Sequence, residues 1–265
     1  MLRWQIKLEG KIIMTAKARK IMLEWPVAGH KHIANRQLAF LAGQFSWVRK
    51  FLLRFPQKIQ DRLFFDKYTV TERIFEKGFC FMQIGKFAAQ IKRIMDVGCC
   101  FSSLPIELAS LGFKLWGIDV NDYFLKHPNF KFVKADVRLT PFGNDFFDLV
   151  TAISTIEHIG LGYYKEARAD DGDYQALREI HRVLRPEGLF IITLPYGRNM
   201  ATPLFRVYDD QRLSFLIQNF KVLDAKYSVN HQDVYWRLAS QKEASNQGIN
   251  ARGRNTGNIC LLLQK

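Results

Sequence analysis

The first candidate for chemistry is a turn rich in small residues that follows a mostly apolar run at 94–97. Gly98 opens the turn, and the small residues behind it are Cys99, Cys100, Ser102 and Ser103. Glycine lets a ligand approach the backbone closely, and free N–H groups at the start of a helix attract a carboxylate or phosphate. The turn is therefore a candidate ligand-binding loop, and its shape alone would also serve a nicotinamide dinucleotide.

Two carboxylates narrow the choice of ligand. Asp119 ends an apolar run about twenty residues after the turn, where an acidic residue of a dinucleotide fold accepts from both ribose hydroxyls. An aspartate in that place has little packing purpose, so we favour a binding role for Asp119. Asp136 ends the next expected strand and could receive the amino group of an adenine.

The adjacent residues Glu157 and His158 follow the apolar segment 146–153. A histidine at that point could take the proton from a hydroxyl group, so the pair is the candidate for catalysis. Alternatively, both side chains bond to the backbone and shape the turn. The sequence leaves the two interpretations open.

Three aspartates crowd into the following loop, at Asp170, Asp171 and Asp173. Their spacing lacks the alternating ligands and the distant glutamate of a calcium loop, so we expect no metal. Asp173 is better placed to cap the helix that follows.

The elements that must position these residues alternate between helix and strand. A helix over 69–90 precedes the first strand, and such alternation predicts a parallel sheet with right-handed crossovers. The expected strands are 94–97, 114–119, 130–136, 146–153, 188–195, 220–229 and 258–264. The other expected helices are 103–111, 174–184 and 211–219, with a polar stretch at 241–257.

Five of these segments occur in the order and spacing found in class I S-adenosylmethionine-dependent methyltransferases. They are DVGCCFSSLPIELASLG, LWGIDV, VKADV, FDLVTAISTIEHIG and LREIHRVLRPEGLFIITLP. Over about residues 90–200 the chain most resembles the methyltransferase type 11 group. The resemblance implies a Rossmann-like doubly wound α/β fold, with a mostly parallel seven-stranded sheet and an antiparallel C-terminal strand, and S-adenosyl-L-methionine as cofactor.

The resemblance also implies a role for each candidate residue. The loop surrounds the amino acid end of the cofactor, Asp119 holds the ribose, and Asp136 with the backbone N–H of Val137 frames the adenine. Ser154 and Thr155 line the pocket. The implied cofactor-binding set is Asp96, Gly98, Cys99, Cys100, Asp119, Val120, Asp136, Val137 and Ser154.

The loop departs from the family pattern in one respect. Cys100 and Ser102 stand at positions where that pattern has glycine, and only Gly98 remains. Asp96 could equally hold the loop as contact the cofactor, and Cys99 is better explained as a small buried filler than as a nucleophile. Cysteine and serine are small enough to leave room for the ligand.

We expect in-line transfer of the methyl group to an oxygen of a small hydroxylated acceptor, such as a sugar or glycan precursor. An Asn-Pro-Pro-aromatic motif is absent after 146–153, which disfavours nucleic acid. The lost glycines favour a rival, a degenerate binding protein that acts through a basic arm. A nicotinamide-dependent oxidoreductase would show more loop glycines, and the two closing strands also favour the methyltransferase.

Charge is concentrated near the N-terminus. The chain carries a net charge of +14, and residues 1–60 hold twelve Lys or Arg against Glu9 and Glu24. We expect a basic arm with an amphipathic helix over 33–59, within a region 1–68, ahead of the methyltransferase domain 69–265. Residues 33–60 could contact an anionic membrane. Unpatterned cysteines and the lack of an apolar span predict a cytoplasmic location.

Overall fold

The computed structural model describes residues 71–164, 166–231, 235–250 and 253–265. All of them belong to the unit of residues 69–265. The predicted basic arm 1–68, its helix over 33–59 and the membrane contact over 33–60 lie outside the described residues. Within the described ranges, no helix is long and apolar enough to cross a membrane.

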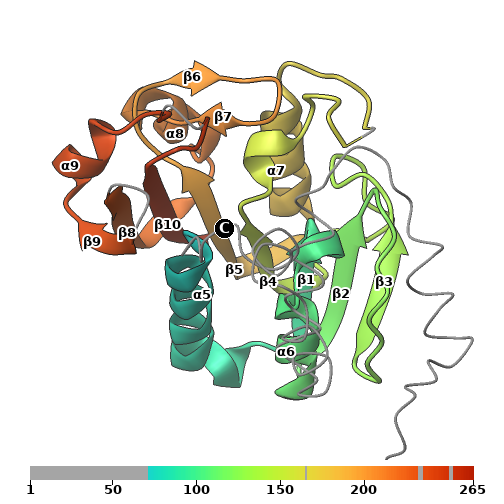
Figure 1. Cartoon of the computed structure of the whole chain (residues 1–265). Coiled ribbons are helices and arrows are strands. Elements are labelled where there is room, and N and C mark those ends of the chain that lie inside the picture. The colour runs from blue at the N-terminus through green and yellow to red at the C-terminus, as the bar shows by residue number, and fades with distance from the viewer. Residues whose placement is uncertain (1–70, 165, 232–234, 251–252) are drawn as a thin grey trace, which may run out of the picture. The chain divides into compact units, whose positions relative to one another are not determined.

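The main sheet has eight strands in the order β3-β2-β1-β4-β5-β10-β8-β9 (Figure 1). Neighbours from β3 to β5 run parallel, whereas the β5–β10, β10–β8 and β8–β9 pairs are antiparallel. The bounds are β1 Arg93–Val97, β2 Lys114–Asp119, β3 Phe130–Lys134, β4 Phe147–Ile153, β5 Leu184–Pro195, β8 Lys221–His231, β9 Tyr235–Ala239 and β10 Gly257–Gln264.

This topology confirms the predicted doubly wound, mostly parallel fold, with one strand more than the seven expected. The additional strand is β9, which lies at the edge and pairs only with β8 among the described strands. A five-residue edge strand draws its structure from its neighbour's hydrogen bonds, so its own sequence gives a weak signal. The polar stretch expected at 241–257 also contains a short helix.

Helices cover both faces of the sheet. Buried side chains of α5 and α6 pack with one set of strand residues, and those of α7 and α8 pack with the other. The helices are α5 Arg73–Phe87, α6 Leu104–Ser110, α7 Gly172–Val183, α8 Asp210–Leu216 and α9 Gln241–Ser245. Three 3-10 turns and a small hairpin complete the described elements: η1 Ala88–Gln90, η2 Cys99–Phe101, η3 Ile156–His158, β6 Met200–Ala201 and β7 Arg206–Val207.

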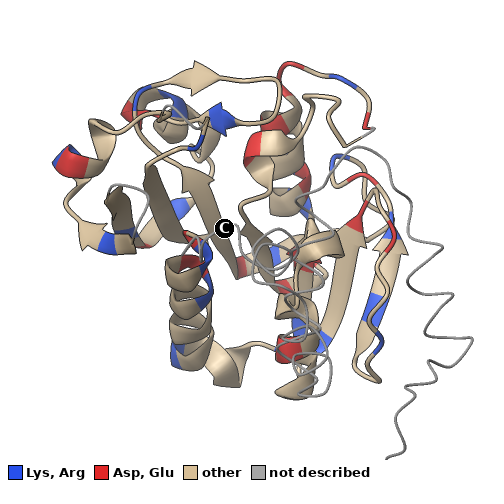
Figure 2. Ribbon diagram, viewed as in Figure 1, with Lys and Arg blue, Asp and Glu red and all other residues tan. Residues whose placement is uncertain are grey.

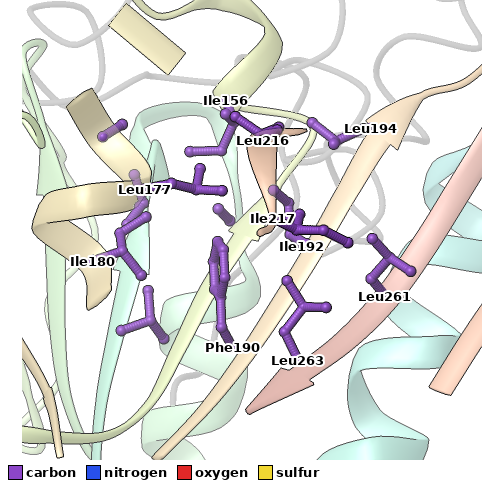
Figure 3. Close-up of a cluster of buried hydrophobic side chains, with 14 of the residues drawn as sticks. Ile156, Leu177, Ile180, Phe190, Ile192, Leu194, Leu216, Ile217, Leu261 and Leu263 are labelled. Carbon is purple, nitrogen blue, oxygen red and sulfur yellow. The ribbon is translucent and has the colours of Figure 1, made fainter. Parts of the chain in front are cut away.

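The strand residues divide between the two faces by alternation. Ile94 packs on the α5 and α6 side, while the next residue, Met95, packs on the α7 and α8 side. Figure 3 shows Phe190 of β5 between Ile180 of α7 and Ile192 of β5 in the cluster on the α7 and α8 side. Each such fully buried side chain contributes roughly 1.5–3 kcal/mol relative to exposure, so the core holds the sheet edge above it in place.

Asp173 does not cap a helix as expected, because Asp171 occupies the N-cap position of α7. The Asp173 carboxylate is fully buried and accepts hydrogen bonds from Tyr208 Oη at 2.9 Å and Arg212 Nη2 at 3.1 Å. It also faces Arg206 Nε at 3.6 Å. Partners that lie more than thirty residues away hold this side chain inside, which local sequence could not reveal.

Candidate functional site

The loop after β1 turns sharply at Gly98, which has a φ of 74°. A Cβ atom there would lie 2.4 Å from the Thr155 side chain, well inside van der Waals contact. The Gly98 N–H donates to the carbonyl of Ile118 at 2.9 Å, which ties the loop to β2. Both the left-handed backbone and the close contact therefore require glycine at this position.

The two lost glycines are explained by the backbone of the same loop. Cys100 lies within the 3-10 turn η2, and Ser102 is extended with a φ of −118°. Within the described loop, only Gly98 has a positive φ. Cysteine and serine therefore fit without strain, and the departure from the family pattern does not by itself disrupt the loop.

Cys99 takes the packing role that the sequence favoured. Its side chain is fully buried, and a Cβ on Gly117 would lie 2.8 Å from its sulfur. Burial raises the pKa of the Cys99 thiol far above its ordinary value. The side chain is therefore a neutral filler between the loop and β2, and any contact of Cys99 with a ligand would come from its backbone.

Asp119 lies against this loop, as its spacing predicted. Its carboxylate accepts the N–H of Cys100 at 2.9 Å and the N–H of Asn121 at 2.8 Å. Partial burial raises the pKa of the Asp119 carboxyl, and the backbone N–H groups of Asn121, Cys100 and Val120 oppose that shift. A half-buried carboxylate with accessible lone pairs is thus held beside the turn after β1, where a ribose could be received.

Asp96 is placed below the loop rather than in it. Its carboxyl is 2% exposed and accepts a hydrogen bond from Thr151 Oγ1 at 2.5 Å. Burial raises the pKa of Asp96 to about 7, and the hydrogen bond from Thr151 opposes this. The bond to Thr151 of β4 favours a structural role for Asp96 over a contact with the cofactor.

Asp136 already has a partner in the structure. Arg138 forms a two-pronged ion pair with it, with Nε at 3.0 Å from both carboxylate oxygens and Nη2 at 2.5 Å from one. Burial raises the pKa of Asp136, but the hydrogen bonds from Arg138 outweigh this and leave the pKa below its ordinary value. An adenine amino group would have to share this carboxylate, whereas the neighbouring Val137 N–H donates to no group in the described part of the chain.

The turn after β4 carries the second group of predicted residues. Ser154 has a φ of 45°, which is uncommon for a residue with a side chain. Its hydroxyl donates to Glu76 at 2.5 Å, and its N–H donates to Thr193 Oγ1 at 2.9 Å. Glu157 and His158 follow in η3, so this turn and the loop after β1 meet at the same edge of the sheet.

His158 is oriented by the backbone. Its Nδ1 lies 2.5 Å from the carbonyl oxygen of Leu204, which can only accept, so Nδ1 carries the proton and Nε2 keeps a free lone pair. Burial lowers the pKa of His158, and the hydrogen bond to Leu204 opposes this. The ring is therefore held neutral, with Nε2 at 3.7 Å from Glu157 Oε1.

Glu157, the other candidate for catalysis, is buried. It is 2% exposed, and its Oε2 has no hydrogen-bond partner among the described residues. Burial raises the pKa of Glu157 well above its ordinary value. An unpaired buried carboxyl is costly, and such groups gather at functional sites.

Sequence reasoning missed the polar residues beneath this turn. Glu76 of α5 is fully buried and binds side chains from the turn after β4, from β5 and from β10, and Arg206 donates to the carbonyl of Ile159 at 2.7 Å. One signal for Glu76 was available, since it precedes Phe79 and Cys80 by three and four residues and so falls on the apolar stripe of its helix.

A doubly wound sheet with a glycine turn after β1 and a carboxylate at the end of β2 defines an α/β protein that binds a nucleotide-like cofactor. Residues 95–192 match the family model described as a methyltransferase domain. Over 81 residues, 31% of this chain and 28% of the relative, the sequence is 35% identical to the ubiquinone/menaquinone biosynthesis C-methyltransferase UbiE of Coxiella burnetii. Over 161 residues, 56% of this chain and 57% of the relative, it is 30% identical to UbiE of Azotobacter vinelandii.

These matches confirm the resemblance to class I S-adenosylmethionine-dependent methyltransferases. The chain spans 28% to 57% of the length of these two curated relatives. The solved structure of the [4+2]-cyclase SpnF is 18% identical, with a TM-score of 0.53 over 76% of this chain and 84% of that chain. This likeness supports the fold alone.

Proposed function

We propose that the chain transfers a methyl group from S-adenosylmethionine to a hydroxyl group of a small acceptor, such as a sugar or glycan precursor. The observation that carries the acceptor part is the orientation of His158, whose Nδ1 is bonded to the Leu204 carbonyl. That bond leaves Nε2 as a base at the edge of the sheet where a bound substrate would lie. Oxygen acceptors need such a base because a hydroxyl group loses its proton as the methyl group arrives.

The residues present fit the cofactor. Asp119 offers carboxylate lone pairs beside the loop, and Val137 offers a backbone N–H. Gly98 keeps the loop free of a side chain that would meet Thr155. When bound, S-adenosylmethionine supplies a methyl group on a sulfonium, which makes that carbon electrophilic.

The chain's own contribution is orientation and proton transfer. The lowered pKa keeps His158 neutral at physiological pH, so Nε2 can accept the hydroxyl proton. A base positioned in this way accelerates a reaction by about 10²- to 10⁴-fold. Tyr164 and Phe205 pack edge-on against the imidazole, with ring centroids at 5.4 and 6.5 Å, and they limit water at the ring.

The matched relatives bear on the acceptor atom. UbiE is named as a C-methyltransferase, so carbon methylation is the result that would overturn the acceptor part of the proposal. A small-molecule acceptor agrees with either atom. The glycan, the cytoplasmic location and the membrane contact through residues 33–60 stay predictions.

Calorimetric titration with S-adenosylhomocysteine tests the cofactor part. We expect wild type to bind and Asp119→Ala to weaken binding about tenfold or more, because the variant loses hydrogen bonds that a carboxylate makes to the ribose. The matched control is Asp122→Ala, since Asp122 is an exposed carboxylate nearby whose side chain pairs with Lys134 on the surface. Folded wild type that does not bind would leave the degenerate binding protein as the better interpretation.

Wild type that binds then justifies an acceptor screen with radiolabelled S-adenosylmethionine, beginning with sugars and other hydroxylated compounds. The methylated atom is identified by NMR spectroscopy of the product. A methyl ether would support the proposal, and a new carbon–carbon bond would contradict it.

A further inference from the structure

Glu76 brings a carboxylate into the core beneath the turn after β4. Its side chain is fully buried in α5, and Oε1 receives the hydroxyls of Ser154 at 2.5 Å and Thr193 at 2.8 Å. Asn258 Nδ2 lies 3.4 Å from the same oxygen. One side chain therefore joins α5 to the turn after β4 and to strands β5 and β10.

The position of Glu76 makes an apolar residue the ordinary choice. Phe79, Cys80 and Ile84 continue the same stripe of α5 and are all buried hydrophobic residues. A carboxylate at this point must be desolvated, and Arg73 compensates only in part, with Nη1 at 3.4 Å from Oε2. Figure 2 shows the positive and negative positions together in the first turns of α5. Packing alone does not account for this group.

Of the hydrogen bonds that Glu76 accepts, the one from Ser154 affects the turn after β4. Ser154 adopts a left-handed backbone that disfavours any residue with a Cβ, and its side chain and its N–H are both held, by Glu76 and Thr193. Thr193 is itself bonded to Glu76. Glu76 thus controls both hydrogen bonds that fix Ser154.

The conformation of Ser154 sets the position of the next residue. Thr155 Oγ1 lies 3.1 Å from the carbonyl of Val97, and the Thr155 side chain fills the space where a Gly98 side chain would be. Thr155 is therefore the contact between the turn after β4 and the loop after β1. A change at Ser154 would move Thr155 off the loop that is predicted to hold the cofactor.

We propose that Glu76 is a positioning residue of the cofactor site, which holds Ser154 in its left-handed conformation and so seats Thr155 on the loop at Gly98. This role rests on the proposed function, because the loop must bind the cofactor for its position to matter. Glu76 itself touches no reacting atom and acts through Ser154.

Titration with S-adenosylhomocysteine tests the assignment on the full chain. We expect Glu76→Leu, which keeps the buried volume and removes the acceptor, to weaken binding about tenfold, whereas Glu76→Gln, which keeps Oε1, stays within about threefold. The double variant Glu76→Leu with Ser154→Gly should recover most of the lost affinity, because glycine adopts a positive φ without the bond. A double variant no better than Glu76→Leu would overturn the proposal.

Gln83→Leu is the matched control for removing a buried polar group from α5. Gln83 is 2% exposed and donates to Asp224 at 2.6 Å, away from the turn. We expect it to lower the melting temperature and leave the affinity unchanged. Equal weakening by Gln83→Leu and Glu76→Leu would reduce Glu76 to a structural residue and overturn the assignment.

Variants of Ser154 and hydrogen exchange test the role of Glu76 in two further ways. If Glu76→Leu does not fold, Ser154→Ala should weaken binding more than Ser154→Gly, since alanine keeps the backbone strain and loses the bond. Hydrogen exchange of the peptide over 150–160 needs no ligand, and we expect faster exchange in Glu76→Leu. Wild type that fails to bind refutes the proposed function, whereas unchanged exchange at 150–160 refutes the role of Glu76.

Discussion

The loop after β1 and the turn after β4 meet at one edge of the sheet but are built in different ways. The loop depends on backbone geometry, since Gly98 turns it and the Cys100 N–H bonds to Asp119. The turn depends on buried ionisable side chains, with Glu76 bonded to Ser154 and with Glu157, whose Oε2 has no hydrogen-bond partner among the described residues, following in η3. The loop is tied to Asp119, nineteen positions away, whereas the turn is held by Thr193 and Glu76, which lie 39 and 78 positions from Ser154.

This difference explains which changes each region tolerates. A backbone-determined loop accepts new side chains wherever φ stays negative, so two family glycines are replaced without strain at 100 and 102. A turn held by a buried carboxylate tolerates few changes to that carboxylate, because the remaining donors would be left unpaired. We therefore expect the two regions to respond differently to substitution and to pH.

The largest effect should follow Gly98→Ala. Left-handed backbone costs about 1–2 kcal/mol for a residue with a Cβ, and here that atom would also lie 2.4 Å from Thr155. We expect a lower free energy of unfolding in urea and loss of measurable S-adenosylhomocysteine binding by calorimetry.

Gly143→Ala provides the control for adding a methyl group. Gly143 is exposed and has no positive φ, and a Cβ added there would meet no described atom within 4 Å. The substitution should change stability by no more than about 0.5 kcal/mol, as surface substitutions usually do. Similar losses in both alanine variants would mean that the loop is not determined by the Gly98 backbone.

A second, pH-dependent effect should follow Asp96→Asn. Folding raises the pKa of Asp96 from 3.8 to about 7, so the folded state binds the proton more tightly and the stability contribution of Asp96 is lost as pH rises through that range. The loss in the free energy of unfolding approaches about 4 kcal/mol when Asp96 is fully ionised. The stability of Asp96→Asn relative to wild type should therefore increase between about pH 4 and about pH 7 in urea titrations.

Asp148→Asn should show the opposite pH dependence of stability. Burial raises the pKa of Asp148, but hydrogen bonds from the N–H groups of Arg93 and Lys92 outweigh this and lower it overall. Its contribution is present above the unfolded pKa and is lost as pH falls, so the deficit of Asp148→Asn should shrink in acid. If the stability of both variants relative to wild type changed with pH in the same direction, burial of Asp96 would not be the cause of the pH dependence.

The same contrast explains how far the sequence could be interpreted. Strand β2 was predicted over its full extent at 114–119, and α5 with η1 fell within the helix expected at 69–90. Asp119 was placed correctly beside the loop because spacing along a βαβ unit fixes which strand ends meet. These features depend on local periodicity and spacing, which can be identified in a single sequence.

The remaining features depend on contacts between distant residues. Asp173 is an acidic residue in the first turn of a helix and looks like a solvent-facing position, until Tyr208 and Arg212 from remote elements enclose it. Glu157 was expected to act in catalysis or to bond to the backbone, and its burial was not predicted. Edge strand β9 exists through its pairing with β8. None of these depends on a local pattern that a single chain displays.

The smallest effect should follow Cys100→Ala, which tests the claim that backbone geometry determines the loop. The Cys100 side chain makes one hydrogen bond in the described structure, from Sγ to the carbonyl of Asp122 at 3.3 Å, while its N–H, which alanine keeps, binds Asp119. Affinity for S-adenosylhomocysteine should therefore stay within about threefold of wild type, since a thiol is a weak donor. Burial, with Asp119 and Asp122 nearby, raises the pKa of Cys100 to about 12, so iodoacetamide should modify it slowly at neutral pH. A large loss of affinity in Cys100→Ala would show that the side chain, and not the backbone, makes the contact at this position.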